Sequence, residues 1–199
     1  MIADVSLEDA TLIQRSRRDP AVFAALFDRH AAALHRYVTR RLGDSLADDV
    51  VAETFLAAFK RRDRYDVSHP DARPWLYGIA ANVIGKHRRT ETRFYLALAR
   101  TGVDEVAESY ADRVEARVSA SAAQRDLAGA LAVLSPEDRE VLLLIAWADL
   151  SYEEVALALG IPIGTVRSRL HRARRKTRAA LGGVDPSAVV TDEEETERG

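Results

Sequence analysis

A chain of 199 residues with 47% hydrophobic side chains is long enough to bury one moderate core or two small ones. It contains no cysteine, which excludes disulfides, thiolate metal sites and cysteine nucleophiles. The formal net charge of −2 hides a segregation: residues 163–181 carry seven Arg and Lys and no acid, whereas residues 184–199 carry six acids and one Arg.

The sequence also disfavours a secreted or membrane-spanning protein and a metal-binding protein. Acidic residues stand near the start, where a signal peptide has a basic stretch, and no apolar run reaches the roughly twenty residues that span a bilayer. The five histidines lack the i,i+4 pairing and the carboxylate neighbours of a metal site. We therefore expect a cytoplasmic protein with no metal and no other cofactor.

Apolar residues recur at helical spacing along almost the whole chain, and strand-like alternation does not persist, which predicts an all-α protein. The first domain is predicted over residues 7–93. In it, one helix ends before Gly43, a second covers about 46–60, a loop with two prolines spans 61–74, and a third helix runs over about 75–87.

The second domain is predicted over residues 124–181. Residues 94–123 are poor in large apolar side chains over much of their length and are interpreted as a flexible linker. Ser135 suits an N-cap and Pro136 the first position of a helix whose apolar residues face most sides. The acidic residues 182–199 are predicted to be a disordered tail.

The stretch "LSYEEVALALGIPIGTVRSRLHRARR" (150–175) is typical of a helix-turn-helix. Ser151 and Glu154 have the spacing of a capping box, and Gly160 stands where the chain must turn sharply. The second helix has no acid to pair with its cations. If these cations contacted DNA phosphates, the counterions condensed on the DNA would be released, which favours binding. We therefore expect it to enter the major groove of DNA, the alternative being a solvated hairpin with a basic outer face.

Individual residues of this second helix are assigned by their position. Those nearest base edges are predicted to be Gly164, Thr165, Arg167, Ser168, His171 and Arg172. The cations predicted to meet phosphates are Arg174, Arg175, Lys176 and Arg178, and Arg169 is counted among the DNA-binding residues of the same helix.

A helix-turn-helix occurs in many DNA-binding proteins, and two segments of the first domain indicate which family this chain resembles. The stretches "LADDVVAETFLAAFKR" (46–61) and "ARPWLYGIAANVIGKHRR" (72–89) closely resemble the core segments of region 2 in extracytoplasmic-function (ECF) sigma factors of the sigma-70 family. Residues 131–181 resemble their region 4, in the family's order and spacing. The resemblance covers roughly residues 20–93 and 124–181. It implies two small helical domains, one for each sigma region.

The resemblance implies a transcription initiation subunit without an active site. Such a subunit binds core RNA polymerase, reads the −35 promoter element as duplex, and helps to open the −10 element. The basic helix would then read the −35 element. Expected partners are the β′ coiled coil and β flap of core polymerase, promoter DNA and an anti-sigma factor. No small-molecule substrate is expected, and the free protein is predicted to be monomeric.

The acidic helix of the first domain is the polymerase-docking helix by this resemblance. Its acids would steer the encounter and its apolar groups would hold the complex. Another interpretation is that Asp48 and Asp49 only stabilise a helix N-terminus. The residues assigned to polymerase binding are Asp48, Asp49, Val50, Glu53, Phe55 and Leu56.

Strand opening needs cations for the backbone and a pocket for a base that has left the stack. By similarity, the loop 64–73 forms much of this pocket, and Asn82 helps to read the captured −10 base. For Trp75 we favour core packing, because its spacing to Leu76 and Ile79 is that of a core residue. The residues assigned to −10 DNA are Arg64, Tyr65, Trp75, Tyr77, Asn82, Lys86, Arg88 and Arg89.

Several alternatives stay open at this point. Acids of the linker, within residues 104–112, either enter the RNA exit channel or are simply solvated, and the acidic tail either screens the basic helix or only solubilises. A stand-alone helix-turn-helix regulator is the main rival, although the sequence lacks a dimerising heptad repeat. An enzyme acting on nucleic acid is disfavoured, because the adjacent Asp48 and Asp49 diverge on a helix.

Overall fold

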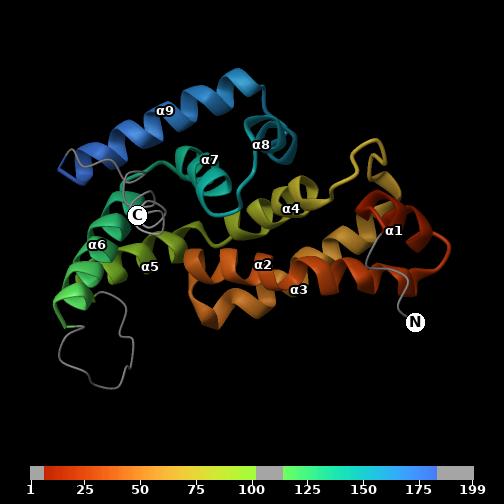
Figure 1. The fold of residues 1–199 in the computed structure, drawn as a ribbon, viewed down its shortest axis with the longest axis horizontal. Coiled ribbons are helices and arrows are strands. Elements are labelled where there is room, and N and C mark those ends of the chain that lie inside the picture. The colour runs from red at the N-terminus through yellow and green to blue at the C-terminus, as the bar shows by residue number, and fades with distance from the viewer. Residues whose placement is uncertain (1–6, 102–113, 183–199) are drawn as a thin grey trace, which may run out of the picture. The chain divides into compact units, whose positions relative to one another are not determined.

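The computed structural model describes residues 7–101 and 114–182, with the side chains of 114–121 left aside. Within these ranges the chain is helical and contains no strand, as predicted. The elements, in chain order, are α1 (Asp9–Ser16), the 3-10 turn η1 (Pro20–Phe23), α2 (Ala24–Leu42), α3 (Asp44–Arg61), η2 (Arg62–Arg64), α4 (Arg73–Gly85), α5 (Arg88–Thr101), α6 (Val114–Ala132), α7 (Pro136–Ala146), α8 (Tyr152–Leu159) and α9 (Ile163–Ala180) (Figure 1). None of these helices is both long enough and apolar enough to cross a membrane.

The described residues group into two compact units that do not follow chain order. One unit contains the residues up to Arg88 together with Leu143–Arg167, and the other contains Arg89–Leu142 together with the residues from Ser168 onward. Helices α7 and α9 therefore each contribute residues to both units.

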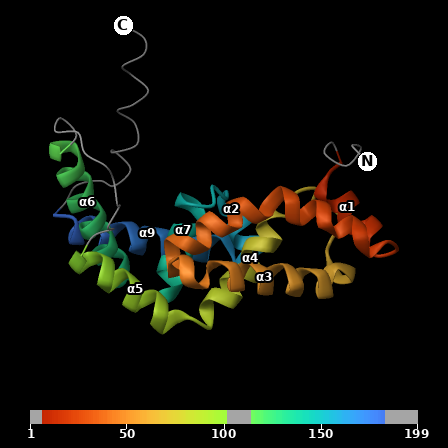
Figure 2. The same ribbon diagram turned by 90° about the horizontal axis from the view of Figure 1, so that it is seen from below.

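The core of the first unit lies between α2, α3 and α4. Helices α2 and α3 run side by side in both ribbon views (Figures 1 and 2), and α4 packs against α3. Their inward faces are apolar at helical spacing, which buries the hydrophobic surface that drives folding. The buried side chains include Leu34, Tyr37, Val38, Val50, Phe55, Leu76, Ile79 and Ile84.

Helix α8 also packs on α4 within this unit. The close approach depends on Gly78, because a Cβ built at this position would lie 2.2 Å from the carbonyl oxygen of Ala158. No side chain larger than hydrogen fits at this point of α4.

The predicted helix signals around the helix-turn-helix are confirmed. The Ser151 hydroxyl accepts from the Glu154 N–H at 3.2 Å, and the Glu154 carboxylate accepts from the Ser151 N–H at 2.7 Å. Gly160 ends α8 with φ of 62°, the left-handed conformation that glycine adopts without strain. Helix α7 begins at Pro136, and the Ser135 hydroxyl accepts from the Asp138 N–H at 3.3 Å.

A buried ion pair stands in the core of the second unit. The Arg139 guanidinium of α7 lies 3.2 Å from the Glu91 carboxylate of α5, and each side chain is only 2% exposed. Arg139 also donates to the carbonyl oxygens of Leu131 and Leu134, at 2.9 and 3.1 Å, and stacks over the Tyr95 ring. One arginine therefore connects α5, α7 and the end of α6.

The segment predicted as a linker is helical on both of its flanks. Helix α5 extends to Thr101 and α6 begins at Val114, both inside the expected linker of residues 94–123. The linker acids of residues 104–112 and the tail from residue 183 lie outside the described residues.

Candidate nucleic-acid and polymerase interfaces

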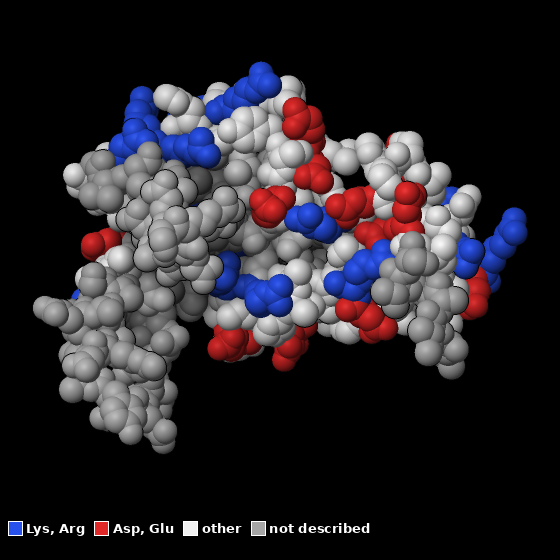
Figure 3. Space-filling view, in the orientation of Figure 1, with Lys and Arg blue, Asp and Glu red and all other residues white. Residues whose placement is uncertain are grey.

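Helix α9 presents a cationic face along its length. Val166, Leu170, Ala173 and Thr177 are buried at intervals of three and four residues, so the side chains between them point outward. Lys and Arg side chains gather over α9 in the space-filling view (Figure 3). The exposed residues of the predicted DNA-binding set are Gly164, Arg167, Ser168, His171, Arg172, Arg174, Arg175 and Arg178, and the half-buried ones are Thr165, Arg169 and Lys176.

Two of these cations are held by an acid on another helix. The Asp138 carboxylate of α7 lies 3.0 Å from Nη2 of Arg172 and 3.5 Å from Nζ of Lys176. Its side chain is 3% exposed, against 45% for Arg172. Burial alone would raise the pKa of Asp138, but the hydrogen bond and charge of Arg172, with the Ser135 and Lys176 contacts, hold it below its usual value.

Sequence reasoning missed this pairing. The basic helix contains no acid, and Asp138 stands 34 residues from Arg172 on another helix. The interaction fixes the direction of the Arg172 guanidinium, because Nε also lies 3.5 Å from the second carboxylate oxygen.

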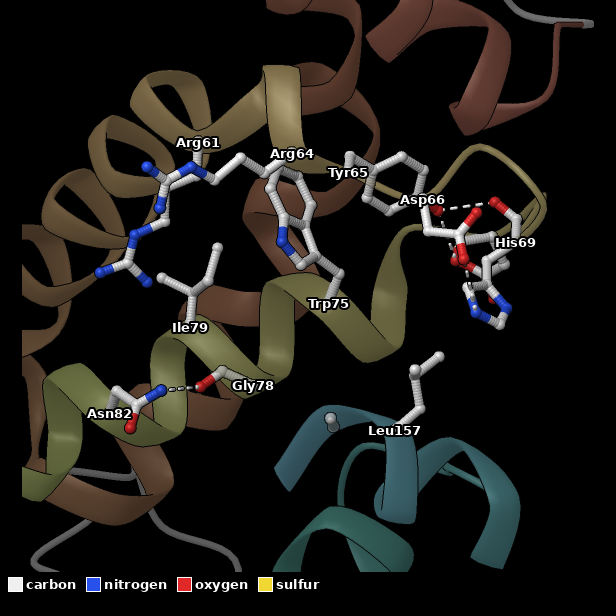
Figure 4. A pocket seen from close by; sticks show the side chains of 12 residues that line it. Arg61, Arg64, Tyr65, Asp66, His69, Trp75, Gly78, Ile79, Asn82 and Leu157 are labelled. Carbon is white, nitrogen blue, oxygen red and sulfur yellow. Dashed lines mark hydrogen bonds and ion pairs between the residues drawn. The ribbon is translucent and has the colours of Figure 1, made fainter. Parts of the chain in front are cut away.

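A pocket of about 340 Å³ opens between the 65–72 loop and α4 (Figure 4). The Tyr65 ring lies 4.9 Å from the Trp75 ring, centroid to centroid. The Arg64 side chain lines the same pocket. Asn82 lines the pocket about two turns beyond Trp75 on α4, where one of its amide N–H groups donates to the Gly78 carbonyl oxygen at 2.9 Å. Leu157 of α8 also lines the pocket.

The loop beside this pocket is fixed by Tyr65. Its hydroxyl donates to the carbonyl oxygens of His69 and Asp71, at 2.7 and 3.2 Å. Burial, followed by the charges of Asp9, Asp71 and Asp66, raises the pKa of the Tyr65 hydroxyl, so it stays a donor.

The structure brings together four of the eight residues predicted for −10 DNA. Arg64, Tyr65, Trp75 and Asn82 line the pocket. The favoured core position of Trp75 is wrong, because the half-buried side chain faces the pocket.

The other four predicted residues lie elsewhere. Tyr77 is a correction: it is 6% exposed and its ring packs edge-on against Tyr37 with centroids 5.1 Å apart, because its position on α4 faces the core. Lys86 forms an ion pair with Glu53 of α3. Arg88 and Arg89 are exposed at the start of α5 and do not line the pocket.

The predicted polymerase-binding helix, α3, divides into an inner and an outer face. Asp48, Asp49, Glu53 and Leu56 are exposed. Val50 and Phe55 are 1% and 5% exposed, so their prediction as surface contacts is corrected: helical spacing turns both into the core.

An apolar residue of α2 was missed at this surface. Phe27 is 46% exposed, and its ring packs edge-on against Phe55 with centroids 4.9 Å apart. Leu56 of α3, the residue after Phe55, is 53% exposed. Helical spacing alone does not distinguish the exposed Phe27 from its buried neighbours Phe23 and Leu26.

Comparison with known proteins gives concordant matches. The family model described as Sigma-70 region 2 matches residues 26–94, and the one described as Sigma-70, region 4 matches residues 124–177. The ECF RNA polymerase sigma factor SigL of Mycobacterium tuberculosis is 38% identical over 165 residues, which cover 82% of this chain and 90% of SigL. The RNA polymerase sigma factor CarQ of Myxococcus xanthus is 32% identical, over 82% of this chain and 91% of CarQ.

Two solved structures are similar in fold. CnrH in complex with the cytosolic domain of CnrY superposes with a TM-score of 0.60 at 29% identity, covering 87% of this chain and 97% of CnrH. The sigma factor RpoE of Bartonella quintana, solved with the anti-sigma factor NepR, superposes with a TM-score of 0.56 at 26% identity, over 80% of this chain and 96% of RpoE.

Proposed function

Because this chain belongs to the extracytoplasmic-function sigma factors of the sigma-70 family, we propose that its surfaces divide promoter recognition, strand opening and polymerase docking among α9, the α4 pocket and α3. The chain is a transcription initiation factor whose partners are core RNA polymerase and promoter DNA. The rival interpretation, a stand-alone helix-turn-helix regulator, leaves the region 2 match without a role.

The pocket beside α4 receives the unpaired base of the −10 element. This proposal depends on one observation, which is that aromatic rings, an amide and cations meet in one cavity of about 340 Å³. Trp75 and Tyr65 offer surfaces for stacking, which stabilises a base that has left the duplex. The Asn82 amide keeps its carbonyl oxygen and one N–H for the edge of the base, and Arg61 and Arg64 are placed to contact the backbone.

The outer face of α9 binds the −35 element in the major groove. Gly164, Thr165 and Arg167 lie in its first turns, where a recognition helix meets base edges. Arg174 and Arg175 lie further along and are exposed, which suits contacts with phosphates. Arg172 takes part with its direction set by Asp138.

The outer face of α3, together with Phe27 of α2, docks on core polymerase. Exposed Asp48, Asp49 and Glu53 attract a basic partner surface, and the exposed side chains of Leu56 and Phe27 each supply apolar area to be buried. In this assignment residues 7–93 carry polymerase binding and −10 opening, residues 124–181 carry −35 binding, and residues 94–123 connect them.

The remaining proposals concern the setting of the protein. An anti-sigma factor is the proposed regulator, since one similar sigma factor was solved with such a partner. The protein acts in the cytoplasm, where its polymerase and DNA are, as a monomer when free. It catalyses no reaction of its own.

Run-off transcription with purified core polymerase on genomic fragments tests the proposal. We expect start sites that appear only when the chain is added. Asn82→Ala should abolish opening of the −10 element while leaving binding to core polymerase unchanged. A chain that binds duplex DNA unaided as a dimer and yields no start site with polymerase would contradict the assignment.

A further inference from the structure

Helix α1 precedes the residues that match sigma region 2, which begin at 26, yet it contacts both ends of the loop beside the pocket. We propose that Asp9 and Arg17 are positioning residues, which hold the 65–72 loop in the shape that accepts an unpaired −10 base. This inference rests on the proposed function of the pocket.

Asp9 holds the end of the loop that leads into α4. Its carboxylate Oδ2 accepts from the Ala72 N–H at 2.9 Å, and the Ala10 N–H donates to the Pro70 carbonyl oxygen at 3.2 Å. Asp9 is 4% exposed, and a buried carboxylate with such partners is held in one orientation.

Two residues of α2 fix Asp9 in turn. Nε2 of His30 lies 2.7 Å from its Oδ2, and Nη1 of Arg29 forms an ion pair with its Oδ1. Burial alone would raise the pKa of Asp9, but the contacts from His30, Ala72 and Arg29 outweigh it and place the pKa below its usual value.

Arg17 holds the other end of the loop. Its Nη2 donates to the Tyr65 carbonyl oxygen at 2.9 Å, and its Nε donates to the Arg62 carbonyl oxygen at 3.3 Å. In return, Nε of Arg62 donates to the Ser16 carbonyl oxygen at 3.3 Å. The loop is therefore tied to α1 at its first residues and again at its last.

The packing of α1 on the rest of the unit does not depend on these polar contacts. Leu12 and Ile13 are fully buried and already anchor the helix by apolar contact. The Asp9 and Arg17 contacts instead reach the loop, which supplies Tyr65, Asp66 and His69 to the pocket wall. A site that binds a flexible single strand gains affinity when its walls are fixed beforehand.

The test uses the full chain with core polymerase and two variants, Asp9→Asn and Arg17→Ala. Opening of the −10 element is followed by the fluorescence of a 2-aminopurine placed there, and discrimination by the ratio of transcripts from promoters with the preferred and a substituted −10 base. We expect both opening and discrimination to fall on the order of tenfold. Affinities for core polymerase and for a −35 duplex should stay unchanged, and Arg17→Lys should restore part of the loss.

Arg18→Ala is the matched control, since Arg18 is an exposed arginine next to Arg17 and should behave as the unsubstituted chain. If Asp9→Asn lowers the melting temperature, Arg17→Ala still tests the inference, because Arg17 is exposed and outside the core. The inference is overturned if both variants retain discrimination, or if core and −35 binding fall in parallel with opening.

The outcome for the pocket itself is read separately. If Asn82→Ala and Trp75→Ala impair opening but the α1 variants do not, the pocket keeps its function and only the positioning role fails. If the pocket variants also leave opening unchanged, the proposed function of the pocket fails and the positioning role fails with it.

Discussion

Replacing Asp138 by asparagine should make DNA binding tighter but less selective. The buried carboxylate forms ion pairs with Arg172 and Lys176, two cations of α9, the helix proposed to bind DNA. The amide introduced by Asp138→Asn would keep the shape of the side chain but not the charge, so both cations would be released toward phosphates. Arg172 would also lose the two contacts, at 3.0 and 3.5 Å, that fix its direction.

The size of the effect follows from counterion release. Each additional phosphate contact steepens the dependence of log affinity on log salt by about 0.9. A fourfold change of salt, from about 50 to about 200 mM, therefore changes affinity by about 3.5-fold for one released cation and about 12-fold for two. Since the released Arg172 no longer points in one direction, it also loses its preference for the specific duplex, so affinity should rise more on unrelated duplex than on the specific one.

The assay is fluorescence anisotropy of the full chain with core polymerase on a −35 duplex and on a scrambled duplex, across this range of salt. Glu137→Gln is the control, because Glu137 is an exposed acid one residue away on the same helix turn. It removes the same charge without releasing a cation. A salt dependence that is equal for the two variants, or a specific-to-unrelated ratio that does not fall, would refute the reasoning.

Three other predictions concern the buried ion pair, the contact between α4 and α8, and Asp9. Arg139→Ala removes the guanidinium that lies 3.2 Å from the buried Glu91 carboxylate, and should lower the free energy of unfolding by about 3–5 kcal/mol in chemical denaturation. An effect below about 1 kcal/mol would contradict the burial of the pair. Gly78→Ala should displace α8 from α4, because the new Cβ would lie 2.2 Å from the Ala158 oxygen, and cross-linking between cysteines introduced into both helices of this cysteine-free chain should fall. Because the pKa of Asp9 is lowered in the folded state, its stabilising contribution is present above the unfolded-state pKa and is lost as pH falls through the folded-state pKa. The difference in unfolding free energy between the unsubstituted chain and Asp9→Asn should therefore disappear below about pH 4. A difference that does not depend on pH would exclude this contribution.

Local signals in the sequence were enough to predict the helix boundaries near the helix-turn-helix. The Ser151 capping box and the Gly160 turn act between residues a few positions apart, so the sequence contains all that they need. The pairs Asp138–Arg172 and Glu91–Arg139 join residues that are 34 and 48 positions apart in different helices, and no local pattern connects them.

The errors on α3 and α4 have a different cause. Resemblance marked which helix carries a function but not which of its faces points outward. Val50 and Phe55 on α3, and Tyr77 on α4, were assigned to surfaces although the helix turns them into the core. Trp75 was predicted to lie in the core because of its spacing to Leu76 and Ile79, but its side chain is half-buried and lines the pocket.

The partners of α1 in the 65–72 segment are all main-chain groups: the Ala72 amide and the carbonyls of Pro70 and Tyr65. Main-chain groups are the same for almost every amino acid, with proline at position 72 the exception for the amide. Side chains between these contact points can therefore change during evolution without breaking the hydrogen bonds that hold the loop to α1. If the pocket has its proposed function, segments exchanged at this place should attach to the same helix without compensating changes and should alter promoter choice.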